Sequence, residues 1–225
     1  MQNKRNCIVL TVFVFSLLVT LVDAFLHPDY FTKIPVKILF FLILPLLFFV
    51  IFSEDFKGFK SLFALEFKGI AKALLLGVAV YAVIVGGYFA LRGVIDFSNV
   101  TVSLTDNMGI TAENFLYVSL YLSIINSFLE EFFFRGYGFV TLKKYVDKRF
   151  AYIFSPIMFA FYHTGMMWGM FDIFTFALLS FGLIIGGLIF NYLNDTNGTI
   201  YSSWLVHMFA NFGINTVGFI LFDAV

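Results

Sequence analysis

Seven long apolar segments constrain this chain more than any other feature. Segments of about 20 mostly apolar residues are separated by short links that contain turn-forming residues such as Pro28 and Gly198. A helix of about 20 apolar residues spans the roughly 30 Å hydrocarbon core of a bilayer. The predicted spans, to within a few residues, are 7–26, 34–53, 69–91, 115–142, 150–170, 171–193 and 200–222. The sequence therefore predicts an all-α, polytopic membrane helical bundle with about seven transmembrane helices.

The composition agrees with burial in lipid. Hydrophobic residues make up 61% of the chain and charged residues only 12%, whereas soluble domains carry about 25% charged residues. The net charge is zero and gives no indication of a nucleic-acid partner, so the bilayer itself is the expected environment. The lone cysteine, Cys7, excludes an intramolecular disulfide. With no internal repeat, we expect one membrane-embedded domain over 1–225, whose polar motifs lie in a core of about 115–222.

Basic residues predict the orientation in the cell membrane. With the N-terminus in the cytoplasm, nine Lys and Arg residues fall on the cytoplasmic side and three on the outside, as the positive-inside rule favours. The three on the outside are Lys33, Lys37 and Arg92, placed in loops or at helix edges. The first span is longer than a signal-peptide core of about 7–15 residues, so we expect a retained helix. Segment 54–68 is either an amphipathic helix on the cytoplasmic face or a solvated loop.

Several ionisable or strongly polar residues lie inside the predicted spans. Such residues are costly in a membrane and are functional candidates by default. They are Glu130, Glu131, Arg135, His163, His207 and Asn211. Lys72 is set aside, because it lies near a helix end where its side chain can snorkel to the interface. The pair Gly182 and Gly186, with GxxxG spacing, predicts close helix packing and not catalysis.

The polar residues of three different spans lie at one depth. At a rise of about 1.5 Å per residue, Glu130 lies about 20 Å from the cytoplasmic end of its helix and His163 about 21 Å from the start of its own. His207 and Asn211 fall about 14 and 20 Å into the last span. Polar residues scattered for purely structural reasons, the alternative reading, have no reason to agree in depth. We therefore expect one shared polar layer.

Helical spacing divides these residues into partners. Glu131 and Arg135 are separated by four residues and share a face, which suits an ion pair. Glu130 is offset from Glu131 by about 100° around the helix axis, so it can face the cavity shared with the other helices. Asn126 lies four residues before Glu130 on nearly the same face, where it can form a hydrogen bond with it. His207 and Asn211 share a face in the same way, and both can donate hydrogen bonds to one point.

This set of groups fits the activation of water. A carboxylate held away from bulk water binds a proton more tightly and can act as a base near neutral pH. Glu130 and His163 can deprotonate a water held between them. His207 and Asn211 can then stabilise the oxyanion formed when that water attacks a peptide carbonyl. Glu131 and Arg135 would support and orient the site.

The same residues resemble three motifs of a known family. Glu130-Glu131-Phe-Phe-Phe-Arg135 resembles the EExxxR motif of the CAAX protease and bacteriocin-processing (CPBP, also called Abi) intramembrane proteases. Phe159-Ala-Phe-Tyr-His163 is similar to its FxxxH motif, and His207-Met-Phe-Ala-Asn211 to its HxxxN or HxxxD motif. Each motif alone is weak, but all three occur in order on predicted helices.

The resemblance implies an all-helical intramembrane endopeptidase. It assigns Glu130 and His163 as the catalytic pair, His207 and Asn211 as the oxyanion hole, and Glu131 and Arg135 as supporting residues. Substrates in the family include prenylated proteins that end in a C-a-a-X sequence, and bacterial relatives are linked to bacteriocin immunity or peptide processing. The expected partner is therefore a peptide or a prenylated protein, and the substrate itself stays open.

The sequence leaves the presence of a metal ion open. No cofactor is expected, because the HExxH helix typical of zinc proteases is absent from the sequence. The alternative is a zinc ion held by Glu130, His163 and His207, which would remove His207 from the oxyanion role.

Two other functions compete with the protease: a non-catalytic bacteriocin self-immunity protein of the same fold and a proton-coupled transporter. The transporter is disfavoured, because no inverted repeat is visible.

Overall fold

The computed structural model describes residues 2–26, 28–65 and 67–223, and these are almost wholly helical, with no strand among them. The N-terminal half contains α1 (Gln2–Leu21), η1 (Val22–Leu26), α2 (Tyr30–Ile38), η2 (Leu39–Ile43), α3 (Leu44–Ile51), η3 (Ser53–Asp55), α4 (Phe56–Ser61), α5 (Phe67–Leu91) and α6 (Ser98–Met108). The C-terminal half contains α7 (Phe115–Tyr121), η4 (Leu122–Asn126), α8 (Ser127–Glu130), η5 (Glu131–Thr141), η6 (Leu142–Lys144), α9 (Lys148–Met167), α10 (Ile173–Asn197) and α11 (Tyr201–Asp223).

The predicted all-α membrane bundle is confirmed. Five helices of the described chain are long and apolar enough to cross a membrane: Gln2–Leu26, Tyr30–Ile51, Gly69–Leu91, Ile173–Asn197 and Tyr201–Phe222. They correspond to five of the seven predicted spans. The other two predicted spans are present as helical rods, one from α7 to η6 and one formed by α9, and these two carry most of the polar residues.

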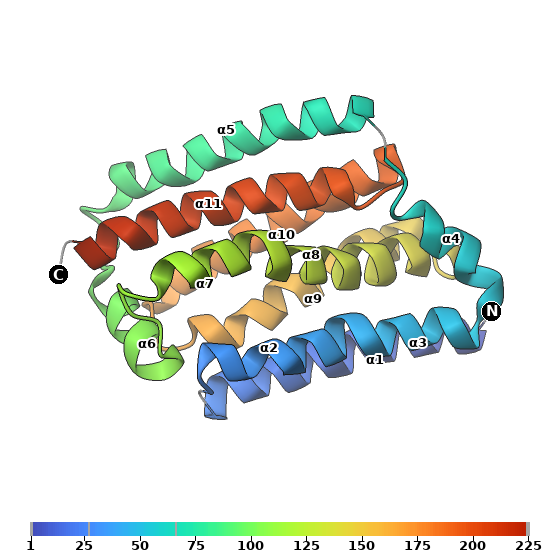
Figure 1. Cartoon of the computed structure of the whole chain (residues 1–225), viewed down its shortest axis with the longest axis horizontal. Helices are drawn as coiled ribbons and strands as arrows, with labels where there is room; N and C mark the ends of the chain where they lie inside the picture. Colours follow the sequence, from blue (N-terminus) through green and yellow to red (C-terminus); the bar gives the residue numbers. More distant parts are fainter. Residues whose placement is uncertain (1, 27, 66, 224–225) are drawn as a thin grey trace.

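The rod from α7 to η6 runs through the middle of the bundle. Figure 1 shows it in green to yellow between the α11 side and the pair formed by α1 and the α2–α3 rod. Behind it, α9 packs against α1 and α10, and α11 packs along α5 at the opposite edge. Every residue from Leu129 to Leu142 is buried. The central rod is therefore enclosed where Glu130, Glu131 and Arg135 project from it.

Phenylalanine rings fill the space around the central rod. Phe41 of η2 stacks on Phe133 with ring centroids 4.4 Å apart, and both rings are fully buried. Burial of an aromatic ring contributes large apolar area, and stacked rings add about 0.5–1.5 kcal/mol per pair. This packing holds the N-terminal helices against the central rod. Because η2 directly follows α2, the same packing also positions α2 beside the polar residues of the rod.

Two local expectations are revised. The link 54–68 contains the short helix α4 and a turn, with residue 66 outside the described residues, so a helix is present over only part of the link. Close packing of Gly182 and Gly186 within the chain is wrong, because a Cβ at either position would meet no atom of the described residues within 4 Å. Close contacts occur instead at Gly187, beside Pro156, and at Gly165, beside the backbone of Thr20.

Candidate active site

The central rod places a buried ion pair at the middle of the site. The Arg135 Nη1 atom lies 3.1 Å from Glu131 Oε1, and both side chains are fully buried. The guanidinium carbon of Arg135 lies 4.0 Å from the ring centroid of Phe159 and 4.9 Å from that of Phe190. The contact expected from the spacing of four residues is therefore present, and two aromatic rings, from α9 and α10, lie against the cation.

The carboxylate of Glu130 has two different sides. Its Oε1 atom accepts hydrogen bonds from Asn126 Nδ2 at 2.6 Å and from the Tyr162 hydroxyl at 3.0 Å. Its Oε2 atom faces His163 Nε2 at 3.9 Å and His207 Nε2 at 3.6 Å. The first oxygen is held by neutral donors, and the second is turned toward two imidazoles from other helices.

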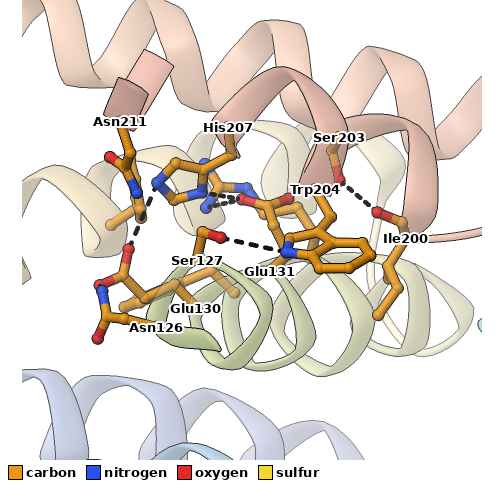
Figure 2. Close-up of polar contacts among 12 residues, drawn as sticks. Asn126, Ser127, Glu130, Glu131, Ile200, Ser203, Trp204, His207 and Asn211 are labelled. Atoms are coloured by element: carbon orange, nitrogen blue, oxygen red, sulfur yellow. Dashed lines mark hydrogen bonds and ion pairs between the residues drawn. The ribbon is translucent and has the colours of Figure 1, made fainter. Parts of the chain in front are cut away.

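His207 lies between the two carboxylates of the first motif. Its Nδ1 atom is 3.0 Å from Glu131 Oε1, and its Nε2 atom faces Glu130. Figure 2 shows His207 reaching down from α11 between Glu130 and Glu131. A carboxylate accepts hydrogen bonds only, so the Nδ1 atom of His207 carries a proton.

His163 is oriented by its own helix. Its Nδ1 atom lies 2.8 Å from the carbonyl oxygen of Phe159, one turn earlier in α9. A carbonyl oxygen can only accept, so Nδ1 is the protonated nitrogen, and in the neutral ring Nε2 is left as a base. This unprotonated nitrogen is the one turned toward Glu130.

Asn211 lies one turn after His207 on α11, beside the imidazole (Figure 2). Its Nδ2 atom donates a hydrogen bond to the Leu122 carbonyl oxygen at 3.0 Å. Leu122 opens η4, so this bond ties the last helix to the central rod. A side-chain amide has two N–H donors, and one of them remains for another acceptor.

Two residues that contact Glu130 were not expected from the sequence. Tyr162 immediately precedes His163, is buried, and donates a hydrogen bond from its hydroxyl to Glu130 Oε1. Lys37 was placed at an outer helix edge, which is wrong, because it is 6% exposed and its Nζ atom lies 3.9 Å from Glu130 Oε1. Lys33, one turn earlier on α2, is also buried and pairs with Asp23 at 2.9 Å. The spacing of four between two lysines inside an apolar span was the available signal.

The zinc alternative requires three or more donor atoms arranged around one point. Among the described residues, no group of three or more His, Cys, Asp or Glu side chains is arranged to hold a metal ion. The residues of the zinc alternative, Glu130, His163 and His207, nevertheless meet at one carboxylate oxygen, Oε2 of Glu130. The same carboxylate oxygen would thus serve either chemistry, and chelation distinguishes the two.

The fold and the site together define a class of protein: an all-α, multi-pass membrane protein with two carboxylates, two imidazoles and a guanidinium buried between its helices. Residues 112–213 match the family model described as Rce1-like, type II CAAX prenyl endopeptidase. The matched segment contains all three motifs, so it is identified as a CAAX-protease-type segment, as the motifs predicted. No curated protein and no solved structure matched the chain.

Proposed function

We propose that this protein is an intramembrane endopeptidase in which Glu130 and His163 activate a water molecule. The observation that carries the proposal is the convergence on Glu130 Oε2 of two imidazole Nε2 atoms, at 3.9 Å from α9 and 3.6 Å from α11. Both distances exceed the range of a direct hydrogen bond. Polar groups separated by more than about 3.5 Å are suited to a bridging water.

The attack on a peptide bond then follows from the orientation of these groups. Glu130 takes one proton of the water as its oxygen bonds to the carbonyl carbon, while the unprotonated Nε2 of His163 accepts a hydrogen bond from the same water and orients it. The carbonyl oxygen becomes an oxyanion, and the C–N bond breaks as the proton passes to the leaving nitrogen. The products are a free carboxyl group and a free amine, so all atoms are accounted for.

His207 and Asn211 supply the donors for the oxyanion. Because Nδ1 of His207 donates to Glu131, the ring can offer an Nε2–H to the oxyanion only when it carries a second proton. The second N–H of Asn211 is the other donor, since the first is held by Leu122. A single donor of this kind contributes roughly 10²–10³-fold to kcat.

The substrate we infer is a prenylated protein that ends in a C-a-a-X sequence, as the name of the matching family indicates. A lipid-modified C-terminus lies at the membrane, where a site buried among transmembrane helices can receive it. A bacteriocin or leader peptide is the alternative substrate. We also propose that the protein lies in the cell membrane with its N-terminus in the cytoplasm, as the distribution of Lys and Arg favours.

The test uses the full chain, purified in detergent, and a fluorescence-quenched peptide that carries S-farnesyl cysteine four residues from its carboxyl end. Glu130→Gln and His163→Ala should abolish cleavage while accumulating in membranes like the wild type. Glu113→Gln is the matched control, because Glu113 is exposed before α7 and should leave cleavage unchanged. Mass spectrometry of the products locates the cut, and cleavage at the wild-type rate by Glu130→Gln refutes the assignment.

Two further arms separate the alternatives. Metal analysis and cleavage after chelation test the zinc chemistry, and stoichiometric zinc whose removal abolishes cleavage would overturn metal-free activation. Protection of cells from a peptide toxin tests the non-catalytic immunity role. Protection that survives Glu130→Gln would favour that role over the protease.

A further inference from the structure

Lys37 approaches the candidate catalytic carboxylate from outside the matched segment. It lies on α2, whereas the family model covers residues 112–213. Its side chain is 8% exposed, although ammonium groups are rarely buried unless they are paired. A buried lysine at this place therefore has a specific partner, and the three motifs do not account for it.

The ammonium group of Lys37 acts on Glu130 through a shared amide. Its Nζ atom donates to Asn126 Oδ1 at 2.9 Å, and Asn126 Nδ2 donates to Glu130 Oε1 at 2.6 Å. The ammonium also lies 5.2 Å from the ring centroid of Tyr162, whose hydroxyl donates to the same Glu130 oxygen. Lys37 thus touches both residues that hold Oε1.

The direction of the Asn126 amide depends on this contact. An amide presents an acceptor oxygen on one side and a donor nitrogen on the other, and the two can exchange by a flip. An ammonium group is a donor only, so it holds the oxygen toward itself and leaves the nitrogen facing Glu130. Without Lys37, the flipped amide would turn its oxygen toward the carboxylate and repel it.

The other charged and titratable groups around Glu130 do not replace Lys37. His163 and Tyr162 face it from α9, and His207 faces it from α11. On its own rod, Arg135 is paired with Glu131. On the α2 side, Lys33 is paired with Asp23. Among the described residues, Lys37 is therefore the one lysine or arginine within 4 Å of Glu130.

We propose that Lys37 is a positioning residue of the active site, which locks the Asn126 amide so that it donates to Glu130 and holds Oε2 toward the imidazoles. This inference rests on the proposed function. It also makes the N-terminal helices, which the family model does not cover, part of the active site.

The first experiment separates positioning from substrate binding, with the purified full chain and the farnesylated peptide. Lys37→Met should lower kcat by about 10²-fold, the cost of a misplaced catalytic group, and leave KM close to the wild-type value. Lys37→Arg, which keeps the charge and the N–H donors, should recover part of the loss. A raised KM with unchanged kcat would overturn the inference, because Lys37 would then bind substrate.

Lys33→Met is the matched control, because Lys33 is equally buried one turn away on the same helix but pairs with Asp23. It should leave kcat within about threefold of the wild type, because its partner is not a residue of the site. An equal fall in kcat for both lysine variants would mean that Lys37 acts through general packing of α2, and would refute positioning.

A double-mutant cycle tests the route through Asn126. In an Asn126→Ala background, Lys37→Met should lower kcat by no more than about threefold, because the amide it orients is already absent. A fall as large as in the wild-type background would overturn the inference. If Lys37→Met does not accumulate, Lys37→Gln serves in the same cycle.

The same cycle on thermal unfolding does not depend on cleavage. Lys37→Met and Asn126→Ala should be non-additive, whereas Lys33→Met and Asn126→Ala should add. Additive effects for the first pair would refute the contact. Lack of Glu130-dependent cleavage by the wild type would refute the proposed function instead, and the unfolding cycle would still decide the contact.

Discussion

Removal of Arg135 should destabilise the protein far more than removal of Arg135 together with its partner. Arg135→Met leaves the fully buried carboxylate of Glu131 without its nearest cation, 3.1 Å away. Loss of one partner of a buried ion pair costs about 3–5 kcal/mol, whereas replacement of both by neutral groups is often close to neutral. None of the guanidinium nitrogens has a hydrogen bond of good geometry in the described structure, and His207 also faces Glu131. Both facts place the expected loss near the lower end, about 3 kcal/mol.

The assay is reversible unfolding in mixed micelles, followed by circular dichroism, for Arg135→Met, Glu131→Gln and the double variant. A loss of about 3 kcal/mol corresponds to roughly a 10²-fold change in the unfolding equilibrium. The double variant should recover more than half of that loss. Arg92→Met is the control, because Arg92 also lies over a ring, 5.2 Å from the Phe89 centroid, but is exposed. A double variant whose loss equals the sum of the single losses would refute the ion-pair explanation.

Two further predictions concern packing and a polar cluster outside the spans. Gly165→Ala should cost about 1–3 kcal/mol by overpacking, because its Cβ would overlap the α1 backbone, whereas Gly182→Ala has open space and should be near neutral. Unfolding of both variants in micelles checks this, and equal stability would contradict it. Burial raises the pKa of Asp55, but hydrogen bonds from Tyr145 and Lys4 outweigh it and lower the pKa below its ordinary value. The ionised Asp55 therefore stabilises the fold above about pH 4, and this stabilisation is lost as the pH falls through the lowered pKa of the folded state. Asp55→Asn should destabilise the protein at pH 7, and its difference from the wild type should shrink as the pH is lowered through that range. A constant difference across that range would exclude the linkage.

The contacts that could be predicted from the sequence are those within one helix. Asn126 to Glu130 and Glu131 to Arg135 are both separated by four residues, and both contacts are present. This holds although η4 and η5 are π-helical, because side chains four apart remain neighbours over a single turn. Recognition of the family from three motifs was likewise confirmed for residues 112–213. The catalytic roles of Glu130 and His163 remain predictions, which the variants above test, and the oxyanion roles of His207 and Asn211 also remain predictions.

Contacts between helices could not be predicted in this way. Periodicity gives the faces of a helix but not the partner that each face meets. Lys37 was therefore placed at an outer edge, although its helix turns it toward Glu130. The contact of His207 with Glu131 was missed for the same reason, since it joins α11 to the central rod. The GxxxG spacing of Gly182 and Gly186 misled because neither position has a neighbour within 4 Å in the part of the chain that the structure describes.

Charge balance explains why the missed lysines belong to this interior. Each of the four buried acidic side chains in the described structure has a basic partner within 4 Å, with Lys4 for Asp55, Lys33 for Asp23, Lys37 for Glu130 and Arg135 for Glu131. An unpaired charge in a low-dielectric interior is far more costly than a paired one. The two carboxylates of the first motif are thus balanced by Lys37 and Arg135, before either histidine is protonated. The Nε2 atom of His163 can then serve as a base, which the proposed activation of water at Glu130 requires.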